Sequence, residues 1–298
     1  MRDIAFLISS NVDPEREGAR EDCFEFQAEF AAIDPACRAA GLRLTPVIWD
    51  EIEEVSRFEA VVVGTTWDYW DRAGRYLERL NRFAAQRPVL NPPPVIAWNL
   101  SKTYLRDLEA AGAPCVPTIW AERADPAAIR DAFEAFGCEE IVVKPVVGAG
   151  AWRQARIRRG EALPGADDLP PAEAMIQPFL PAVAEEGEYS FLFFGGAFSH
   201  ALVKRPKSGD YRVQSLYGGR EAVHEPSPGE LDLARAVLEA AGRATGEDAF
   251  LYARVDMARG LDGRLALMEL ELIEPYYYPK QGPETGARFA AALEAGLA

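Results

Sequence analysis

The chain has 298 residues, 49% of them hydrophobic, so it is long and apolar enough for two or three packed domains and too apolar for a disordered protein. Its 47 acidic residues outnumber its 32 basic residues, and the resulting net charge of -15 argues against nucleic-acid and anionic-membrane partners. Only two histidines occur, and the four cysteines show no CxxC spacing, which argues against a histidine-based zinc site.

The few cysteines and the lack of a signal-like first segment predict a cytoplasmic protein. The apolar segments are all shorter than a bilayer requires, so we expect no membrane partner. The oligomeric state is left open, with a homodimer as one option.

Strands alternate with helices in the first third of the chain. This alternation predicts a parallel α/β unit, because helical crossovers join parallel strands. Three successive prolines at 92–94 should stop regular structure, and we expect a domain boundary there. The expected strands cover 4–8, 44–49 and 60–63, and the expected helices cover 23–40 and 75–86.

A helix capped by Asn99 or Ser101 and running to residue 111 should follow that boundary. Lys102 would then lie in the first helical turn, where free N–H groups and the helix dipole favour anions. The structural alternative is an ordinary exposed helix lysine.

Lys144 ends an apolar strand predicted over 141–143, and a glycine loop follows it. Gly148 and Gly150 would allow backbone N–H groups to close over a phosphate. The structural alternative is a lysine that reaches solvent beside an ordinary turn.

The last third of the chain has sequence features that are typical of antiparallel strands. Gly195 and Gly196 form a strong turn signal, which predicts a hairpin. A tight turn would place His200 opposite Phe191, as a packed rather than a catalytic histidine. The expected strands of this hairpin cover 190–194 and 197–203, and the expected helices cover 228–245 and the residues from 285 onward.

Two strand-like runs near the C-terminus carry carboxylates at alternate positions. A turn centred on 262–263 would place Asp256 opposite Glu269 and Arg254 opposite Glu271, all on one face. Like charges opposite each other destabilise a sheet, and a Mg²⁺ ion held by these oxygens would remove that cost. A solvated sheet face without function is the alternative.

The usual nucleotide and hydrolase motifs are missing: the sequence contains no P-loop, no dinucleotide-binding glycine motif, no GxSxG elbow and no HExxH. In their order along 98–275, the features above resemble the ATP-grasp superfamily. The matching segments read Asn99-Leu-Ser-Lys102, Val142-Val-Lys144-Pro145, Gly148 to Ala151, Ile176-Gln-Pro-Phe-Leu180, Gly187-Glu-Tyr-Ser190, Arg254-Val-Asp256 and Glu269-Leu-Glu271.

Within this superfamily the chain is similar to glutathione-synthetase-like enzymes, and most of all to the O-ureidoserine cyclo-ligases of cycloserine biosynthesis. It departs from the usual superfamily pattern at Glu271, where an asparagine is customary. The segments that carry the narrower resemblance are Thr66-Trp-Asp-Tyr69, Phe198-Ser-His200, Tyr217-Gly-Gly219 and Glu269 to Pro275.

The resemblance implies a three-lobed ATP-grasp architecture that combines α/β and α+β parts. The expected units are an N-terminal α/β domain on the substrate side, a central lobe and a C-terminal lobe with the magnesium site. Their expected bounds are 1–97, 98–180 and 181–298.

The implied activity is an ATP-dependent carboxylate–amine ligation that forms an amide through an acyl phosphate. The partners would be small-molecule carboxylate and amine substrates of amino-acid type, joined within one molecule or between two, in antibiotic biosynthesis. The implied cofactors are ATP and two Mg²⁺ ions, with Mn²⁺ able to substitute. The rival functions are an ATP-grasp ligase of peptides or proteins, a phosphotransferase and a non-catalytic nucleotide-binding module.

The resemblance also assigns roles to residues. The implied catalytic residues are Lys144, Arg212 and Arg254. The implied metal ligands are Asp256, Glu269 and Glu271. The implied nucleotide-binding residues are Lys102, Lys144, Gly148, Gly150, Gln177, Pro178, Phe179, Leu180 and Glu188. The implied substrate-binding residues are Thr66, Trp67, Asp68, Lys204, Arg212, Gly218 and Gly219.

Three of these assignments have structural alternatives. Lys204 could simply end a strand, and Trp67 could be a packing residue. The basic cluster at 153–159 could cover the triphosphate, although an exposed strand face is the preferred interpretation.

Overall fold

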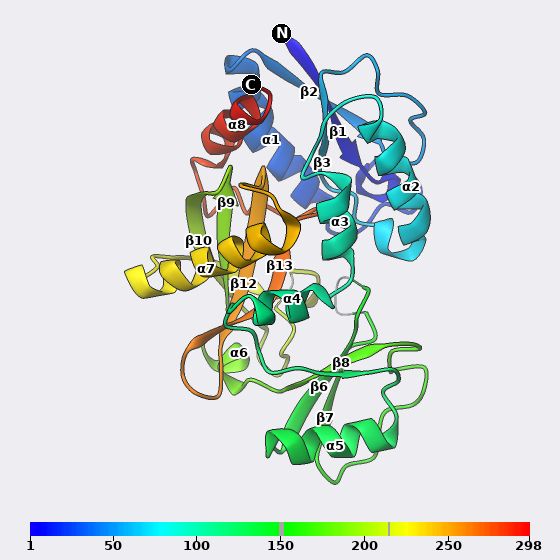
Figure 1. Ribbon diagram of the computed structural model, residues 1–298, viewed down its shortest axis with the longest axis vertical. Coiled ribbons are helices and arrows are strands. Elements are labelled where there is room, and N and C mark those ends of the chain that lie inside the picture. The colour runs from blue at the N-terminus through cyan, green and yellow to red at the C-terminus, as the bar shows by residue number, and fades with distance from the viewer. Residues whose placement is uncertain (149–151, 214) are drawn as a thin grey trace.

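The computed structural model describes residues 1–148, 152–213 and 215–298. Three sheets follow one another along the long axis of the molecule (Figure 1): an N-terminal sheet, a middle sheet and a lower sheet. The N-terminal sheet is parallel and the other two are antiparallel. The predicted mixture of α/β and α+β parts is therefore confirmed. No helix in these ranges is both long and apolar enough to cross a membrane.

The N-terminal sheet has the strand order β2-β1-β3-β4, with parallel pairing throughout. Its two central strands are the apolar runs of the sequence, and both are buried on both faces, as parallel strands covered by helices are. The elements are β1 (Arg2–Ile8), η1 (Ser10–Val12), α1 (Phe24–Ala39), β2 (Leu42–Ile48), β3 (Ala60–Val63), η2 (Tyr69–Arg72), α2 (Ala73–Ala84) and β4 (Val89–Leu90).

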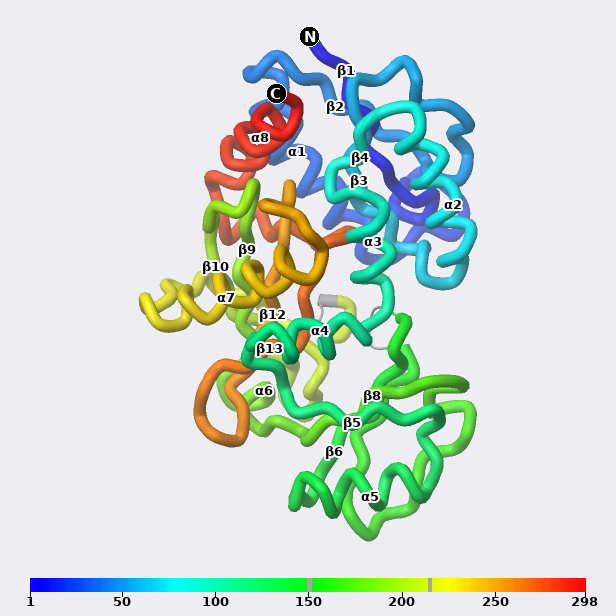
Figure 2. Tube along the Cα trace, in the orientation of Figure 1, coloured from blue at the N-terminus to red at the C-terminus, as the bar shows by residue number. Residues whose placement is uncertain are grey.

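The C-terminal helix α8 (Thr285–Gly296) returns to this first unit and lies against α1 (Figure 2). A glycine makes the approach close: a Cβ atom on Gly286 would lie 2.2 Å from the carbonyl oxygen of Ala32. The two ends of the chain therefore build one hydrophobic core, in which Phe289 and Leu293 pack with Ile33.

The region after the prolines differs from its prediction. A helix, α3 (Pro93–Leu100), begins at the proline run, because proline is tolerated in the first helical turn, where its N–H would have no partner. The chain then breaks and a second helix, α4 (Tyr104–Ala110), follows. The helix predicted to run to residue 111 is present as α4, but its predicted start at Asn99 or Ser101 is wrong, and Lys102 lies in the break rather than in a first helical turn.

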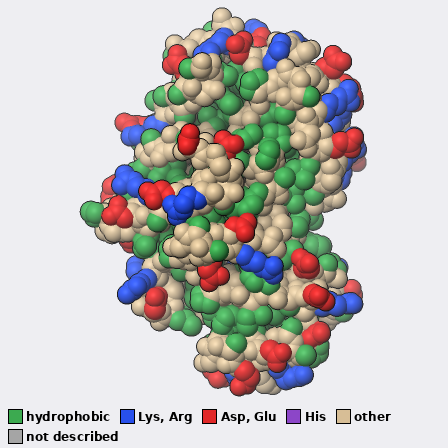
Figure 3. All heavy atoms as spheres, in the orientation of Figure 1, with side chains coloured by type: hydrophobic (Ala, Val, Ile, Leu, Met, Phe, Trp, Pro, Cys, Tyr) green, Lys and Arg blue, Asp and Glu red, His purple; other side chains and the backbone are tan. Residues whose placement is uncertain are grey.

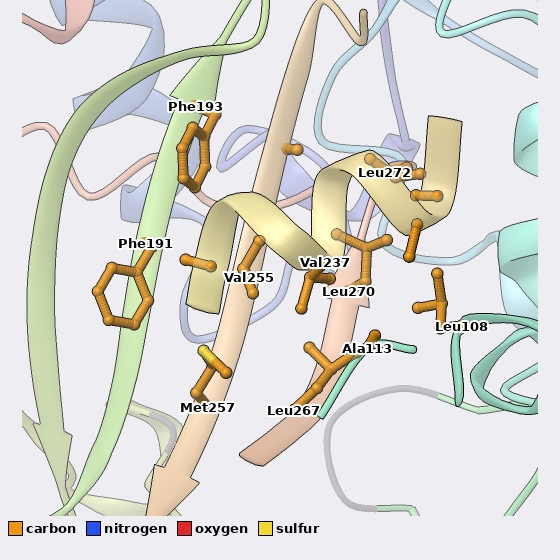
Figure 4. Packing of buried hydrophobic residues seen from close by; sticks show 14 of the residues in the cluster. Leu108, Ala113, Phe191, Phe193, Val237, Val255, Met257, Leu267, Leu270 and Leu272 are labelled. Carbon is orange, nitrogen blue, oxygen red and sulfur yellow. The ribbon is translucent and has the colours of Figure 1, made fainter. Parts of the chain in front are cut away.

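The middle sheet has the order β11-β10-β9-β12-β13. One face packs under a long helix, α7, and this core contains Phe191, Val237, Val255 and Leu270 (Figure 4). Helix α4 packs on the same core through Leu108. The elements are α6 (Pro181–Glu185), β9 (Glu188–Phe194), β10 (Ala197–Arg205), η3 (Ser215–Tyr217), β11 (Arg220–His224), α7 (Pro228–Thr245), β12 (Tyr252–Arg259) and β13 (Leu265–Glu271).

The predicted hairpin between β9 and β10 is present, with both turn glycines at positive φ. The predicted cross-strand partner of His200 is wrong, however. An irregularity between Phe198 and His200 places His200 opposite Leu192 rather than Phe191. His200 is hydrogen-bonded, as expected, through Nε2 to the carbonyl oxygen of Tyr277 at 3.0 Å. Burial lowers the pKa of His200 to about 4.

The lower sheet has the order β5-β8-β6-β7 and is covered by α5. Asp125 caps this helix by accepting hydrogen bonds from two backbone N–H groups of its first turn. Neither α5 nor the edge strands β5 and β7 are among the predicted elements. The elements are β5 (Ile119–Ala121), α5 (Pro126–Phe136), β6 (Glu140–Pro145), β7 (Ala155–Arg158) and β8 (Ala174–Pro178).

Candidate active site

A cavity lies between the middle and lower sheets, and residues from all three units line it. The molecule narrows between the lower lobe and the rest of the chain (Figure 3). On the face shown there, acidic and basic side chains are interspersed and form no continuous patch of one sign. The predicted site residues in the cavity wall are Lys102, Lys144, Gly148, Gln177, Pro178, Phe179, Leu180, Glu188, Lys204, Arg212, Arg254, Asp256, Glu269 and Glu271.

The face of the middle sheet opposite the α7 core carries the predicted carboxylates. Asp256 lies opposite Glu269, and Arg254 lies opposite Glu271, so the predicted pairing is confirmed. On the neighbouring strand β9, Ser190 faces Asp256 and donates a hydrogen bond to its Oδ1. The alternation of polar and apolar residues along these strands thus presents all four charged groups to the cavity.

Cations compensate these carboxylates. Lys102 Nζ lies 2.7 Å from Glu269 Oε1, and Arg254 pairs with both Asp256 and Glu271. Lys204 adds a contact of 3.4 Å to Asp256. Within the described ranges, no three acidic, histidine or cysteine side chains converge closely enough to hold a metal ion. Lysine and arginine side chains of the chain itself therefore offset the repulsion between these carboxylates.

Burial and ion pairing oppose each other in these groups. Burial would raise the pKa of Glu269, but Lys102 holds it below its ordinary value. Burial would likewise raise the pKa of Asp256, but Arg254 and Lys204 lower it. At Glu271 burial prevails over Arg254 and raises the pKa to about 7. The face therefore contains carboxylates with very different proton affinities.

The two predicted phosphate lysines approach the cavity from different elements. Lys144 is the penultimate residue of β6 and donates to Gln177 Oε1 at 3.1 Å. Burial lowers the pKa of Lys144, which no carboxylate contacts within ion-pair distance among the described residues. Lys102 Nζ donates to the carbonyl oxygen of Gly148 at 3.0 Å and so ties the break between α3 and α4 to the glycine loop. Gly150 lies outside the described residues.

The segment predicted to hold adenine follows β8 at the junction of the two lobes. Phe179 is buried, and the guanidinium of Arg156 stacks 3.6 Å above its ring. Arg156 and Arg158 both pair with Glu140 across β6 and β7. These two members of the basic cluster therefore lie on a paired strand face, as the preferred interpretation expected.

The basic residues predicted to bind the substrate form ion pairs with acidic side chains of the chain itself. Lys204 is buried and pairs with Glu188; burial would lower its pKa, but Asp256 and Glu188 raise it. Arg212 contacts Asp210 at 2.8 Å and stacks over Tyr217. Gly218 and Gly219 are not among the residues that line the cavity.

The three residues predicted after β3 also lie outside the cavity wall. Thr66 Oγ1 lies 2.9 Å from Tyr76 Oη, in hydrogen-bonding contact, and Asp68 accepts a hydrogen bond from Trp49. Trp67 Nε1 donates to the carbonyl oxygen of Glu274 at 3.1 Å. These side chains join the N-terminal unit together and to the segment after β13.

Several lining residues were not predicted as site residues: Tyr69, Asn99, Trp152, Tyr211, Glu274 and Tyr278. Tyr69 directly follows the predicted residues 66–68, and Glu274 lies three residues beyond Glu271, so adjacency to named motifs was the available signal. Asn99 belongs to the matching segment Asn99-Leu-Ser-Lys102, but it was considered only as a helix cap. Its side-chain amide bonds to the backbone of Leu270 and Leu272 on and beside β13, a contact that depends on folding.

Comparison with known proteins places this geometry in context. Residues 4–91 match the family model of the N-terminal domain of the D-cycloserine synthetase DcsG. The chain is 32% identical over 271 residues to the cycloserine biosynthesis protein DcsG of Streptomyces lavendulae, covering 87% of this chain and 90% of that protein. It is 36% identical over 152 residues to the glutathione synthetase of Prochlorococcus marinus (strain MIT 9313), covering 48% of this chain and 44% of that one.

Solved structures of ligases show the same similarity. The crystal structure of D-cycloserine synthetase DcsG matches with a TM-score of 0.86 at 28% identity, covering 99% of this chain and 100% of that chain. D-alanyl-alanine synthetase A from Vibrio cholerae matches with a TM-score of 0.66 at 14% identity over 99% of this chain and 97% of that one, which shows a shared fold.

Proposed function

The chain belongs to the family of ATP-grasp carboxylate–amine ligases that includes the cycloserine biosynthesis protein DcsG, and we propose that it uses ATP to form an amide bond in a small amino-acid-like substrate. One observation carries the proposal: Arg254 and Asp256 on β12 face Glu271 and Glu269 on β13, and this charged face lines one cavity with Lys102 and Lys144.

The nucleotide would lie in this cavity between the middle and lower sheets. Lys144 supports a phosphate-binding role because it is a half-buried cation that donates to the neutral Gln177 and that, among the described residues, pairs with no carboxylate. Lys102 would join it, with Gly148 and Gly150 closing over the phosphates. The adenine would lie along Gln177, Pro178, Phe179 and Leu180, with Glu188 beside it.

The side chains of Asp256, Glu269 and Glu271 fit a magnesium site in chemistry, because they offer hard oxygen donors from one face of two paired strands. These residues would hold Mg²⁺, which when bound neutralises phosphate charge. Two ions, replaceable by Mn²⁺, are part of the proposal. Since Lys102 and Arg254 now pair with these carboxylates, the same cations would be released toward the phosphates when the carboxylates bind metal.

The proposed reaction needs no nucleophilic side chain. A substrate carboxylate oxygen attacks the γ-phosphorus, and the bond to ADP breaks. A nitrogen of the substrate then attacks the carbonyl carbon of the acyl phosphate, loses a proton and expels inorganic phosphate. Arg254 would stabilise charge on the transferred group, and Arg212 and Lys204 would attract the carboxylate, so catalysis consists of positioning and charge neutralisation.

The substrate end would lie toward the N-terminal unit, which contributes Tyr69 to the cavity wall. We propose the units 1–97, 98–180 and 181–298, with the first on the substrate side. Thr66, Trp67 and Asp68 would act there by holding Tyr69 and the segment after β13 in place. The similarity to DcsG supports a role in antibiotic biosynthesis and ring closure within one molecule.

The proposed function is tested by measuring the release of ADP and inorganic phosphate. The enzyme is incubated with Mg-ATP and O-ureidoserine, serine or alanine, each as both enantiomers, and ADP and free phosphate are measured separately. We expect release of one phosphate per ADP with at least one of these acids, and a hydroxamate when hydroxylamine is added to trap the acyl phosphate. A stable phosphorylated product would make the protein a phosphotransferase, and no ADP with any of these acids would contradict the proposed substrate class.

A further inference from the structure

Glu274 is a carboxylate in the cavity wall that the proposed mechanism does not use. It lies three residues beyond Glu271, the last residue of β13. Its carbonyl oxygen accepts the hydrogen bond from Trp67, which fixes its backbone to the N-terminal unit. Tyr69, two residues after Trp67, lines the same cavity. Glu274 therefore stands where the N-terminal unit meets the cavity.

Among the described residues, Glu274 also differs from the other acidic residues of the wall in having no counter-ion. Within the described ranges, no lysine, arginine or histidine nitrogen lies within 4.0 Å of its carboxylate, whereas each of the others has such a partner. The paired carboxylates are Glu188 with Lys204, Asp256 with Arg254 and Lys204, Glu269 with Lys102, and Glu271 with Arg254.

The surroundings of Glu274 favour a cation over any other ligand. Burial and the nearby Glu271 and Glu269 raise its pKa well above the ordinary value, so an uncompensated negative charge is unfavourable there. The nearest cations are committed elsewhere, since Arg254 pairs with two carboxylates and Lys102 with Glu269. A positively charged group of a ligand would remove this penalty and form a charge-assisted hydrogen bond.

We propose that Glu274 binds the ammonium group of an amino-acid substrate while the carboxylate of the same molecule is activated near Arg254. This inference rests on the proposed ligase function and specifies its substrate: an acid that carries a protonated amino group near the reacting carboxylate. Glu274 then acts as a specificity-determining residue, because an acid without the amino group leaves the half-buried carboxylate uncompensated.

Binding of the ammonium group by Glu274 also restricts which substrate nitrogen can form the new amide bond. A nitrogen held as an ammonium ion has no lone pair, so it cannot attack the acyl phosphate. The nitrogen that enters the new amide bond must therefore be another one, either farther along the same molecule or in a second substrate. The amino group bound by Glu274 should leave unchanged in the product.

The test compares matched acids with and without the amino group. Serine, alanine and O-ureidoserine, each as both enantiomers, are paired with 3-hydroxypropanoate, propanoate and 3-(ureidooxy)propanoate, and kcat/KM is measured as ADP release with hydroxylamine as the acceptor. For the best pair, we expect the wild-type chain to prefer the amino acid at least about tenfold, the effect of one hydrogen bond to a charged group. Glu274→Gln should reduce this preference to about threefold or less, chiefly by raising KM for the amino acid. Glu274→Asp should keep part of it.

Controls separate this role from others. Glu294→Gln removes an exposed glutamate of α8 and should leave the preference unchanged. The thermal shift caused by Mg-ADP should be the same in Glu274→Gln as in the wild type, at every Mg²⁺ concentration. A weaker dependence on Mg²⁺ in the variant would make Glu274 a metal ligand instead and overturn the inference.

Two outcomes in the substrate panel also overturn it. One is a wild-type chain that turns over both members of every pair equally, and the other is a Glu274→Gln variant that keeps the full preference. Either leaves the ligase function standing, because ADP and phosphate are still released together. The failure of that function appears differently, as no ADP release with any acid of the panel.

Discussion

Lys102 Nζ lies 2.7 Å from Glu269 Oε1, so a lysine predicted to bind phosphate neutralises a carboxylate predicted to bind metal. Arg254 likewise neutralises Asp256 and Glu271 through ion pairs. The site therefore contains an internal salt-bridge network. Substitutions in it should affect stability as well as turnover, to an extent that depends on how deeply each pair is buried.

Asp256→Asn should lower the free energy of unfolding of the nucleotide-free protein by about 3 kcal/mol, because it leaves two buried cations, Arg254 and Lys204, without their shared partner. Glu269→Gln should lower it by less than about 1 kcal/mol, since the side chain of Glu269 is 35% exposed and solvent screens its pair. Urea unfolding of both variants measures the difference. Equal stability of the two would show that burial does not govern this network.

Mg-ATP at a hundredfold excess over its dissociation constant should stabilise the wild-type chain by about 2.7 kcal/mol. Lys144→Met should raise the dissociation constant about tenfold or more, because a desolvated contact between lysine and phosphate is lost. Thermal unfolding across an ATP titration reports both quantities. Lys280→Met, which removes an exposed lysine outside the cavity wall, is the matched control and should bind ATP as the wild type does.

The buried Glu29 on α1 should make stability fall between about pH 4.5 and pH 8. Burial raises its pKa from 4.5 to about 8, so the folded chain holds a proton that the unfolded chain has already released in this range. The stabilisation is complete below pH 4.5 and is lost as the pH rises through 8. Urea unfolding at several pH values should show this decline.

Glu29→Gln should flatten that decline and raise stability at pH 8, because glutamine stays neutral and its oxygen can still accept the 2.8 Å hydrogen bond from the N–H of Tyr277. A variant that is less stable than the wild type at pH 8 would mean that the carboxylate is charged and compensated in the folded chain.

Gly286→Ala should destabilise the protein by about 1–3 kcal/mol, because the added Cβ would overlap the carbonyl oxygen of Ala32 and push α8 away from α1. Gly74→Ala is the matched control: this helical glycine of α2 has open space around it, and alanine there should stabilise by up to about 1 kcal/mol. Thermal unfolding of both variants tests the contact. Two variants of the same sign would contradict the close packing of α1 and α8.

Local patterns in the sequence were sufficient to predict many of the strands and helices of this fold. The alternation of strands and helices predicted the parallel N-terminal sheet, and the turn glycines predicted the hairpin of β9 and β10. Residue spacing alone predicted that Asp256 would face Glu269, because side chains on a strand alternate with a period of two. Failures occurred where a local rule has exceptions. Proline is a helix breaker except in a first turn, and α3 begins there.

The sequence by itself determined which residues face together on each strand, and its ordered motifs indicated an ATP-grasp ligase. Only the tertiary structure decided which charges meet. Lys102 and Glu269 are far apart in the sequence, and packing of the break after α3 against β13 brings them into contact. The same packing leaves Glu274 in the cavity wall with no counter-ion among the residues that the structure describes. Periodicity is a local property of the chain, whereas ion pairs and their absence depend on contacts between distant segments, which no local pattern encodes.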